Sequence, residues 1–388
     1  MTTLLLIIIY IAFISLGLPD SMLGAAWPLM QREMSLPLEG AGLVSTIVSA
    51  GTIVSSLLSG KLIKKLGTGL LTMLSVLMTA LALLGFSATQ NYFWLCLMAI
   101  PLGLGAGAVD AALNDFVARN FSSRHMSWLH AFWGVGATTG PLLLAYVVSQ
   151  SGRWQGGYRT VSIIQFVLVA ILALSLPLWR KQDKANGEDV AHSKTNGSIW
   201  KIPGMIPNLI SFFGYCGMEL TAGLWFASFL VAERGLTAET ASAWASSYYF
   251  GIMLGRMING FLTMKFSSKT LIRSGQTLIL VGLILLFIPQ ATFSLIGLLL
   301  VGMGCAPIYP SMLHETPARF GEENSSRLMG IQMASAYLGL TVMPPLVGLI
   351  ASKTSLGIFP WALLLLWILN VLGSESVNKV VGGSKLPN

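Results

Sequence analysis

Charged residues are scarce in this chain, and their scarcity excludes a soluble protein of ordinary composition. Asp, Glu, Lys and Arg make up 10% of the 388 residues, whereas they account for about 25% of soluble domains. Hydrophobic residues make up 54%, so the chain is expected to cross a membrane several times. The net charge is +8, but the basic residues lie between apolar segments and form no continuous face. We therefore expect a lipid bilayer around the protein and no nucleic-acid partner.

Cysteine and catalytic motifs are also sparse. The three cysteines, Cys96, Cys216 and Cys305, each lie within an apolar segment and show no metal or redox spacing; this indicates small buried side chains. The sequence has no Walker loop and no HExxH motif, and its GLGAG stretch lies within an apolar helix and follows no strand. We expect no enzyme activity, no cofactor and no bound metal. Any transport must then be driven by an ion gradient or by the gradient of the substrate itself.

Long apolar segments fill most of the chain. A membrane-spanning helix needs ~20 largely apolar residues, and twelve segments qualify. The predicted spans are 3–28, 40–62, 69–89, 92–117, 127–149, 160–179, 204–232, 240–264, 270–289, 293–314, 326–351 and 356–373. The first span lacks the basic start and the small-residue cleavage site of a signal peptide, so we expect it to be retained.

The longest polar segment separates the sixth and seventh predicted spans. Its Gly, Asn, Ser and charged residues indicate a flexible cytoplasmic linker over 180–203. We predict a six-helix bundle over 1–179 before it, and a second bundle with a short tail over 204–388 after it. Seventeen Lys and Arg residues lie in the loops on the side of the termini, against five in the opposite loops. This distribution predicts a multi-pass protein of the plasma (cytoplasmic) membrane with both termini cytoplasmic.

The two halves resemble each other in sequence. LGLGAGAVDAALNDFVARNF in the fourth span parallels VGMGCAPIYPSMLHETPARF in the tenth, which sets Asp110 opposite Tyr309. WGVGATTGP in the fifth span parallels YLGLTVMPP in the eleventh, and basic segments follow the second and eighth spans. Two parallel repeats of six helices, with a substrate site between them at the membrane midplane, are typical of secondary transporters. The predicted fold is an all-α membrane protein of twelve helices in two pseudo-symmetric bundles, and we expect a monomer.

Three acidic residues lie deep within predicted spans: Asp20, Asp110 and Glu219. A carboxylate at that depth costs at least ~2.5–3.5 kcal/mol, so it is rare unless it faces a cavity or a partner. No Lys lies deep in a span, and Arg256 falls toward the cytoplasmic end of the eighth, so we expect the three acids to lack cationic partners. Removal from water favours the protonated form of a carboxyl group, which makes all three candidates for proton coupling.

Other polar and aromatic residues could complete a sugar site. Pro19 should distort the first span beside Asp20, Asn114 follows Asp110 by one helical turn, and His130 could bind a ligand or relay a proton. Sugar rings stack on aromatic faces, and we expect at most three of seven candidate aromatics to touch substrate: Trp27, Trp133, Tyr215, Trp225, Tyr249, Tyr309 and Tyr337. The predicted substrate-binding residues are Asp20, Asp110, Asn114, His130, Trp133, Glu219, Trp225, Tyr249, Tyr309 and Gln332.

Five motifs resemble the major facilitator superfamily, and within it the fucose–galactose–glucose:proton symporters and related sugar permeases. They are GLPD (17–20), GAGAVDAALN (105–114), LHAFWGVGATTGPLL (129–143), GMEL (217–220) and GMGCAPIYPSML (302–313). The resemblance implies that Asp20 and Asp110 act in proton coupling and sugar binding, with Asn114 and His130 near the sugar. The sequence departs from the family where Asp110 replaces a Glu, where His130 replaces a Gln-rich segment, and where Lys64 replaces a loop Asp. The first two departures leave the identity of the sugar open.

The sequence therefore predicts a secondary active transporter that moves a hexose or deoxyhexose by proton-coupled symport with alternating access. The alternative is a proton-coupled exporter of amphipathic drugs or metabolites, which the 18 Met and 18 Phe residues would suit. A sensor that binds without transporting is a third interpretation, disfavoured by the absence of a large polar domain between or after the spans. The coupling ion also stays open, because carboxylates with hydroxyl and carbonyl groups could hold Na⁺.

Overall fold

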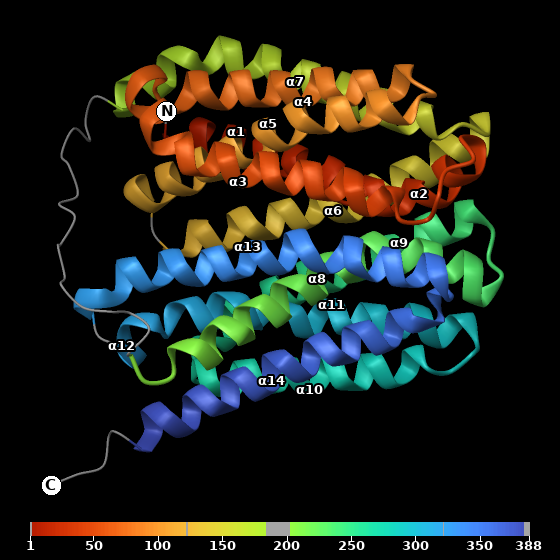
Figure 1. Ribbon diagram of the computed structural model, residues 1–388. Coiled ribbons are helices and arrows are strands. Elements are labelled where there is room, and N and C mark those ends of the chain that lie inside the picture. The colour runs from red at the N-terminus through yellow and green to blue at the C-terminus, as the bar shows by residue number, and fades with distance from the viewer. Residues whose placement is uncertain (1, 122, 184–201, 321, 384–388) are drawn as a thin grey trace, which may run out of the picture.

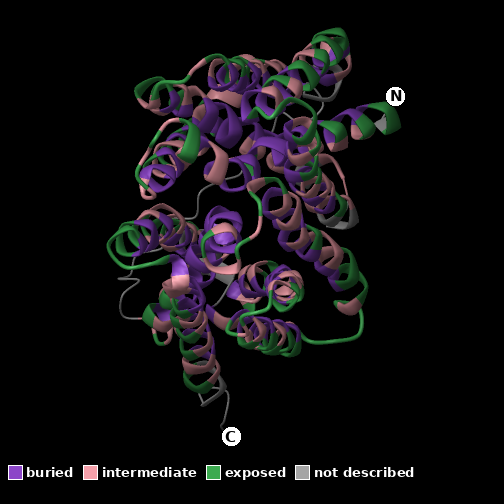
Figure 2. Ribbon diagram, turned by 90° about the vertical axis from the view of Figure 1, so that its right-hand side faces the viewer, coloured by how far each residue is buried: buried purple, intermediate pink, exposed green. Residues whose placement is uncertain are grey.

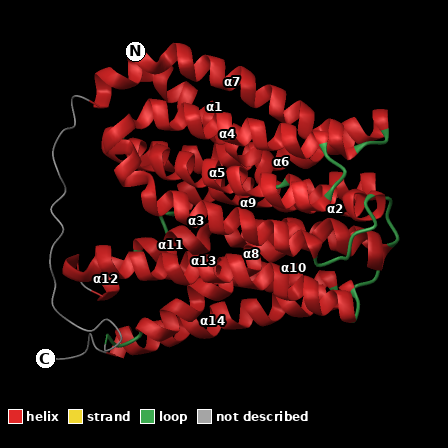
Figure 3. Cartoon of the chain, turned by 45° about the horizontal axis from the view of Figure 1, so that its top comes forward, coloured by secondary structure: helices red, strands yellow, loops and turns green. Residues whose placement is uncertain are grey.

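The computed structural model describes residues 2–121, 123–183, 202–320 and 322–383, and helices account for nearly all of them (Figure 3). The first part of the chain forms α1 (Thr2–Asp20), α2 (Met22–Glu33), α3 (Gly40–Leu66), α4 (Thr68–Ala88), α5 (Tyr92–Asn120), α6 (Ser123–Ser151) and α7 (Trp154–Asp183). The second part forms α8 (Met205–Arg234), α9 (Ala238–Leu262), α10 (Ser268–Leu286), α11 (Ala291–His314), α12 (Thr316–Phe320), α13 (Glu322–Lys353), the short 3₁₀ helix η2 (Leu356–Ile358) and α14 (Phe359–Gly383).

Each predicted span corresponds to a helix of membrane-crossing length, which confirms the all-α membrane fold. Among the described residues, 11 segments are both long and apolar enough to cross a membrane, with α1 and α2 counted as one. The one predicted span outside these 11 segments is the eighth, 240–264, which corresponds to the 25-residue helix α9. It is less apolar than the others because it contains Glu239, Arg256 and Asn259 among many small polar residues.

The first span is interrupted beside Asp20, as Pro19 predicts. Helix α1 ends at Asp20, Ser21 forms a turn, and α2 begins at Met22. The Ser21 hydroxyl donates a hydrogen bond to the Leu18 carbonyl at 3.3 Å, which satisfies one backbone acceptor that the interruption frees. The break places a carboxylate at the end of a half-helix in the middle of the span.

The helices form two groups that lie one above the other in Figure 1. Helices α1 to α7 pack mainly on one another, and so do α8 to α14, while α2, α3 and α6 of the first group contact α8, α9 and α13 of the second. The start of α1 and the end of α14 lie at the same end of the molecule (Figure 1). Residues 184–201 of the predicted linker and 384–388 of the predicted tail lie outside the described residues, so the domain boundaries stay a prediction.

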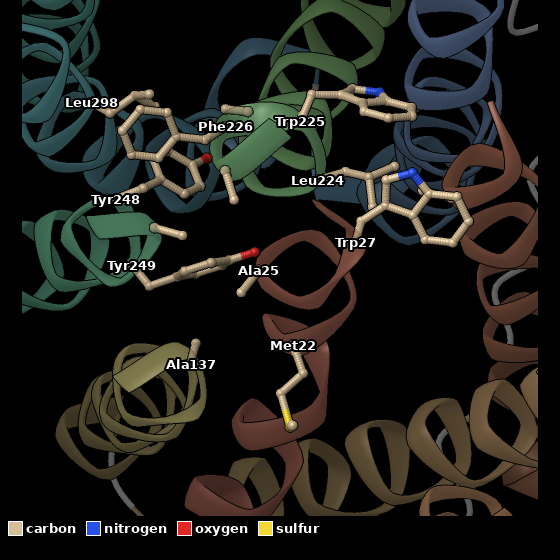
Figure 4. Packing of buried hydrophobic residues seen from close by; sticks show 14 of the residues in the cluster. Met22, Ala25, Trp27, Ala137, Leu224, Trp225, Phe226, Tyr248, Tyr249 and Leu298 are labelled. Carbon is tan, nitrogen blue, oxygen red and sulfur yellow. The ribbon is translucent and has the colours of Figure 1, made fainter. Parts of the chain in front are cut away.

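Large apolar side chains cover the outside of the helices as well as the inside. Leu57 is 79% exposed and Leu174 is 84% exposed, which suits a surface in contact with lipid and not with water. Buried residues follow the inner faces of both groups (Figure 2). Between the groups, Trp27 of α2 lies beside Leu224 of α8 (Figure 4). The two groups are therefore joined by a packed apolar contact.

Candidate transport site

A cavity of about 380 Å³ lies between the two groups of helices. Its lining comes from α1, α2, α3, α4, α5, α6 and α7 of the first group and from α8, α9 and α13 of the second. Six of the ten predicted substrate-binding residues line it: Asp20, Asp110, His130, Trp133, Glu219 and Tyr249. All three predicted proton-coupling carboxylates therefore share one cavity.

Asp20 is held by an aromatic residue of the neighbouring helix α6. The indole Nε1–H of Trp133 donates a hydrogen bond to Asp20 Oδ2 at 2.8 Å. The helices approach closely because Gly17 has no side chain: a Cβ there would lie 2.1 Å from the Trp133 carbonyl oxygen. The Asp20 side chain remains exposed to the cavity. The broken span and the close helix contact together fix one carboxylate where a solute can reach it.

Asp110 is paired with Asn114 one turn further along α5. The Asn114 Nδ2 group donates hydrogen bonds to both the carbonyl oxygen and Oδ1 of Asp110, each at 3.0 Å. Asn114 is not part of the cavity lining, so it positions Asp110 from behind. Within the described residues, no Lys or Arg forms an ion pair with Asp20 or Asp110.

Glu219 differs from Asp20 and Asp110 in having a cationic neighbour, Arg256 of α9. Arg256 Nη2 is 3.6 Å from Glu219 Oε1, and Arg256 also lines the cavity. The expectation that all three acids lack a cationic partner is therefore wrong for Glu219. The reason is geometric: helical side chains point toward the N-terminus of their helix. The long Arg256 side chain therefore reaches from the last turns of α9 toward the middle of the membrane.

Aromatic residues from both groups meet beside Arg256. The rings of Trp133 and Tyr249 are edge to face, with centroids 6.4 Å apart. The Tyr248 hydroxyl donates to the Glu219 carbonyl at 2.9 Å, which ties α9 to α8. A Cβ at Gly134 would lie 2.8 Å from Met253 Cβ, so this glycine allows α6 and α9 to approach. Trp133 thus contacts residues of both groups.

Three predicted residues lie away from the cavity. Trp225 is fully buried, and its Nε1–H donates to the Pro344 carbonyl at 2.8 Å. The Tyr309 hydroxyl donates to Met333 Sδ at 2.6 Å. Gln332 is fully buried and accepts a hydrogen bond from the Thr316 hydroxyl at 3.0 Å. These contacts lie within the second group of helices, and none of the three residues lines the cavity.

Several lining residues are not predicted by the sequence pattern. Arg256, predicted to lie near the end of its span, lines the cavity, and so do Ser45, Ser49 and Thr52 of α3, which carry hydroxyl groups. Tyr337, one of the seven candidate aromatics, also lines it. Three of those seven, Trp133, Tyr249 and Tyr337, therefore face the cavity. The α3 hydroxyls repeat at intervals of three and four residues, and this one-face pattern could have revealed them.

Close backbone contacts join the two groups on the side of the cavity away from the termini. A Cβ at Gly24 of α2 would lie 2.3 Å from the Gly223 carbonyl of α8, and one at Gly42 of α3 would lie 2.6 Å from Pro345 Cα of α13. The Thr46 hydroxyl also lies 3.4 Å from the Thr341 carbonyl. We infer that the cavity is closed at this end, because small residues let the opposing backbones touch.

Two helical groups around a central cavity that contains three carboxylates define the class of the protein as a polytopic membrane carrier. The sequence model of the Major Facilitator Superfamily matches residues 9–215 and again residues 208–375. The chain belongs to this superfamily, whose members are membrane transporters and not enzymes. This confirms the resemblance found in the sequence.

Relatives of known sequence and structure agree with this assignment. The chain is 24% identical to the Saccharomyces cerevisiae Bypass of stop codon protein 6, over 93% of this chain and 79% of the relative. It is 23% identical to the Bacillus subtilis glucose/mannose transporter GlcP, over 87% of this chain and 86% of the relative. A crystal structure of a bacterial homologue of the human lysosomal transporter Spinster superposes with a TM-score of 0.73 at 10% identity, covering 98% and 97% of the two chains. That last likeness shows the fold alone.

Proposed function

We propose that the protein is a proton-coupled symporter of a small polar solute of the hexose or deoxyhexose class. The observation that carries the proposal is the convergence of Asp20 and Asp110 on one cavity without an ion-pair partner among the described residues. A carboxyl group in such a place can take up a proton and release it when the cavity opens to the other side. Glu219, the third predicted proton-coupling residue, has Arg256 as a counter-ion, so we assign the coupling first to Asp20 and Asp110.

The cavity also supplies the groups that a sugar needs. Hydroxyl groups of a sugar both donate and accept hydrogen bonds, and the carboxylates, His130 and the α3 hydroxyls offer partners for both. The apolar faces of the ring can stack on Trp133, Tyr249 or Tyr337. The name of the relative GlcP states that it transports glucose and mannose, which supports a hexose as substrate.

Transport follows an alternating-access cycle in this proposal. Asp20 or Asp110 takes up a proton from outside, the sugar binds between the two groups of helices, and the groups rock about the cavity. The contacts at Gly24 and Gly42 separate in one state and close in the other. Proton release toward the cytoplasm then resets the carrier, which we place in the plasma membrane as a monomer with both termini inside. The sugar drives the change only insofar as it binds the two states with different affinity.

The test is proton movement in liposomes that contain the purified full-length protein. A panel of hexoses and deoxyhexoses is added outside, and a pH-sensitive dye reports the external pH. Symport predicts external alkalinisation with at least one sugar and none with liposomes that lack the protein. A lack of response to every sugar, with proton movement only on addition of cationic amphiphiles, would refute the symporter and favour the exporter.

A further inference from the structure

Arg256 lies against the face of Trp133 inside the cavity. Its guanidinium carbon is 5.0 Å from the centroid of the Trp133 ring, within the ~6 Å at which a cation is attracted to an aromatic face. Trp133 belongs to the first group of helices and Arg256 to the second. The positive charge therefore occupies an aromatic face at the centre of the transport site.

The groups around this charge are those that bind organic cations in other settings. Trp133 and Tyr249 stand edge to face at 6.4 Å, and the carboxylates of Asp20 and Glu219 line the same cavity. Aromatic faces with nearby negative charge are the usual surroundings of a bound quaternary ammonium group. The residues around Arg256 thus have the chemistry of a binding site for an organic cation, and the guanidinium of the chain itself lies among them.

Few contacts bind Arg256 to its surroundings. A guanidinium has five N–H donors, yet the described residues accept no hydrogen bond from it, and its contact with Glu219 is 3.6 Å long. An arginine that served mainly to stabilise the helix packing would be expected to form direct, bidentate hydrogen bonds with a carboxylate or with carbonyl groups. The side chain is instead 19% exposed toward the cavity.

We propose that Arg256 is a specificity-determining residue that excludes organic cations from the transport cavity by occupying their place on Trp133. Among the described residues it is the only Lys or Arg in the lining, so nothing else there supplies this charge. The cavity then accepts uncharged solutes and rejects cations of similar size. This goes beyond the proposed function, because it concerns what the site excludes and does not depend on which sugar is carried.

Removing the charge should convert the site into a binder of organic cations. In Arg256→Gln or Arg256→Met, the Trp133 face becomes free while Asp20 and Glu219 remain in place. A cation on a desolvated aromatic face gains ~2 kcal/mol, which corresponds to roughly thirtyfold in affinity. Like-charge repulsion by Arg256 is lost at the same time.

The experiment measures binding of tetraethylammonium to the purified full-length protein in lipid nanodiscs by calorimetry. We expect at least about tenfold tighter binding in Arg256→Gln and Arg256→Met than in the wild type. Arg256→Lys keeps the charge and should bind as weakly as the wild type. Lys265→Gln, which removes an exposed charge outside the cavity, is the control for net charge and should also match the wild type.

A double variant tests whether the gain in tetraethylammonium affinity comes from the Trp133 face. Trp133→Leu in the Arg256→Gln background should lose the tighter binding, since the aromatic face is gone. The proposal is overturned if the wild type binds tetraethylammonium as tightly as Arg256→Gln, or if neither neutral variant gains affinity although size-exclusion chromatography shows it folded. The wild-type measurement can overturn the proposal even if a variant fails to fold. Sugar-driven proton movement is measured separately, so failure of the symport proposal leaves this result intact.

Discussion

The closed end of the cavity depends on Gly24, which is a direct place to perturb the carrier. An alanine Cβ at position 24 would lie 2.3 Å from the Gly223 carbonyl oxygen and 2.9 Å from Leu224 Cα. Both neighbours are backbone atoms, so no side-chain rotation can relieve the overlap. The α2 and α8 backbones must move apart, and we expect Gly24→Ala to destabilise the closed arrangement relative to the one open at this end.

The size of the effect follows from packing energies. An extra methyl group in a well-packed contact costs typically ~1–3 kcal/mol, which shifts the ratio of closed to open molecules by about fivefold to 150-fold. The gain in helix propensity from Gly to Ala, roughly 0.5–1 kcal/mol, applies to both states and cancels. A Cβ added to Gly60 of α3 would meet no other atom within 4 Å, so Gly60→Ala provides the matched control.

Cysteine labelling measures the shift. Ser49 lines the cavity from α3, and Ser49→Cys with Cys96→Ala gives a reporter, since Cys216 and Cys305 are buried. An impermeant maleimide is applied from the membrane side opposite the termini. Gly24→Ala should raise the labelling rate at least about fivefold over Gly60→Ala. Equal rates in the two folded variants would refute the assignment of Gly24 to the closed end.

Three further predictions concern single side chains. Trp133→Phe keeps an aromatic ring but loses the N–H that donates to Asp20. Because a hydrogen bond to a charged group contributes ~1.5–3 kcal/mol, sugar counterflow should fall by about tenfold or more. Counterflow at the wild-type rate would contradict this role. Gln332→Leu lies outside the cavity lining, so counterflow per folded molecule should be unchanged, whereas a clear loss would return Gln332 to the site. Asn370→Leu removes the acceptor of one of two hydrogen bonds donated by Gln276 Nε2, the other going to Ser374, and removes the amide that donates to Ser211. The loss of these buried hydrogen bonds should lower the free energy of unfolding by ~1–3 kcal/mol. Thermal unfolding in detergent checks this, and an unchanged midpoint would contradict it.

The fold could be predicted from the sequence because each helix had to supply an apolar segment long enough to cross the membrane. Proline marked the break in the first span, since it cannot donate the helical hydrogen bond. The three acids could be predicted to face a cavity because a carboxylate in lipid is costly. These inferences depend on local chemistry, and the structure agrees with each of them.

Whether each of the other candidate residues lies in the cavity depends on which face of its helix meets which neighbouring helix. Most of α8 is surrounded by protein, so its apolar residues continue around the helix and do not show that Trp225 points away from the cavity. Gln332 is polar and deep, but its partner Thr316 comes from a separate short helix, α12. The position of Arg256 along the chain places it near the end of its span, but its long side chain extends back toward the N-terminus of α9 and so reaches Glu219.

The most direct test of the account is simultaneous recording of sugar flux and proton flux in liposomes that contain wild-type protein or Asp110→Asn. The account predicts that the wild type takes up protons together with sugar. Asp110→Asn should still exchange labelled sugar across the membrane but should no longer move protons with it. Proton uptake that stays coupled to sugar in Asp110→Asn, and again in Asp20→Asn, would contradict the assignment of coupling to these carboxylates.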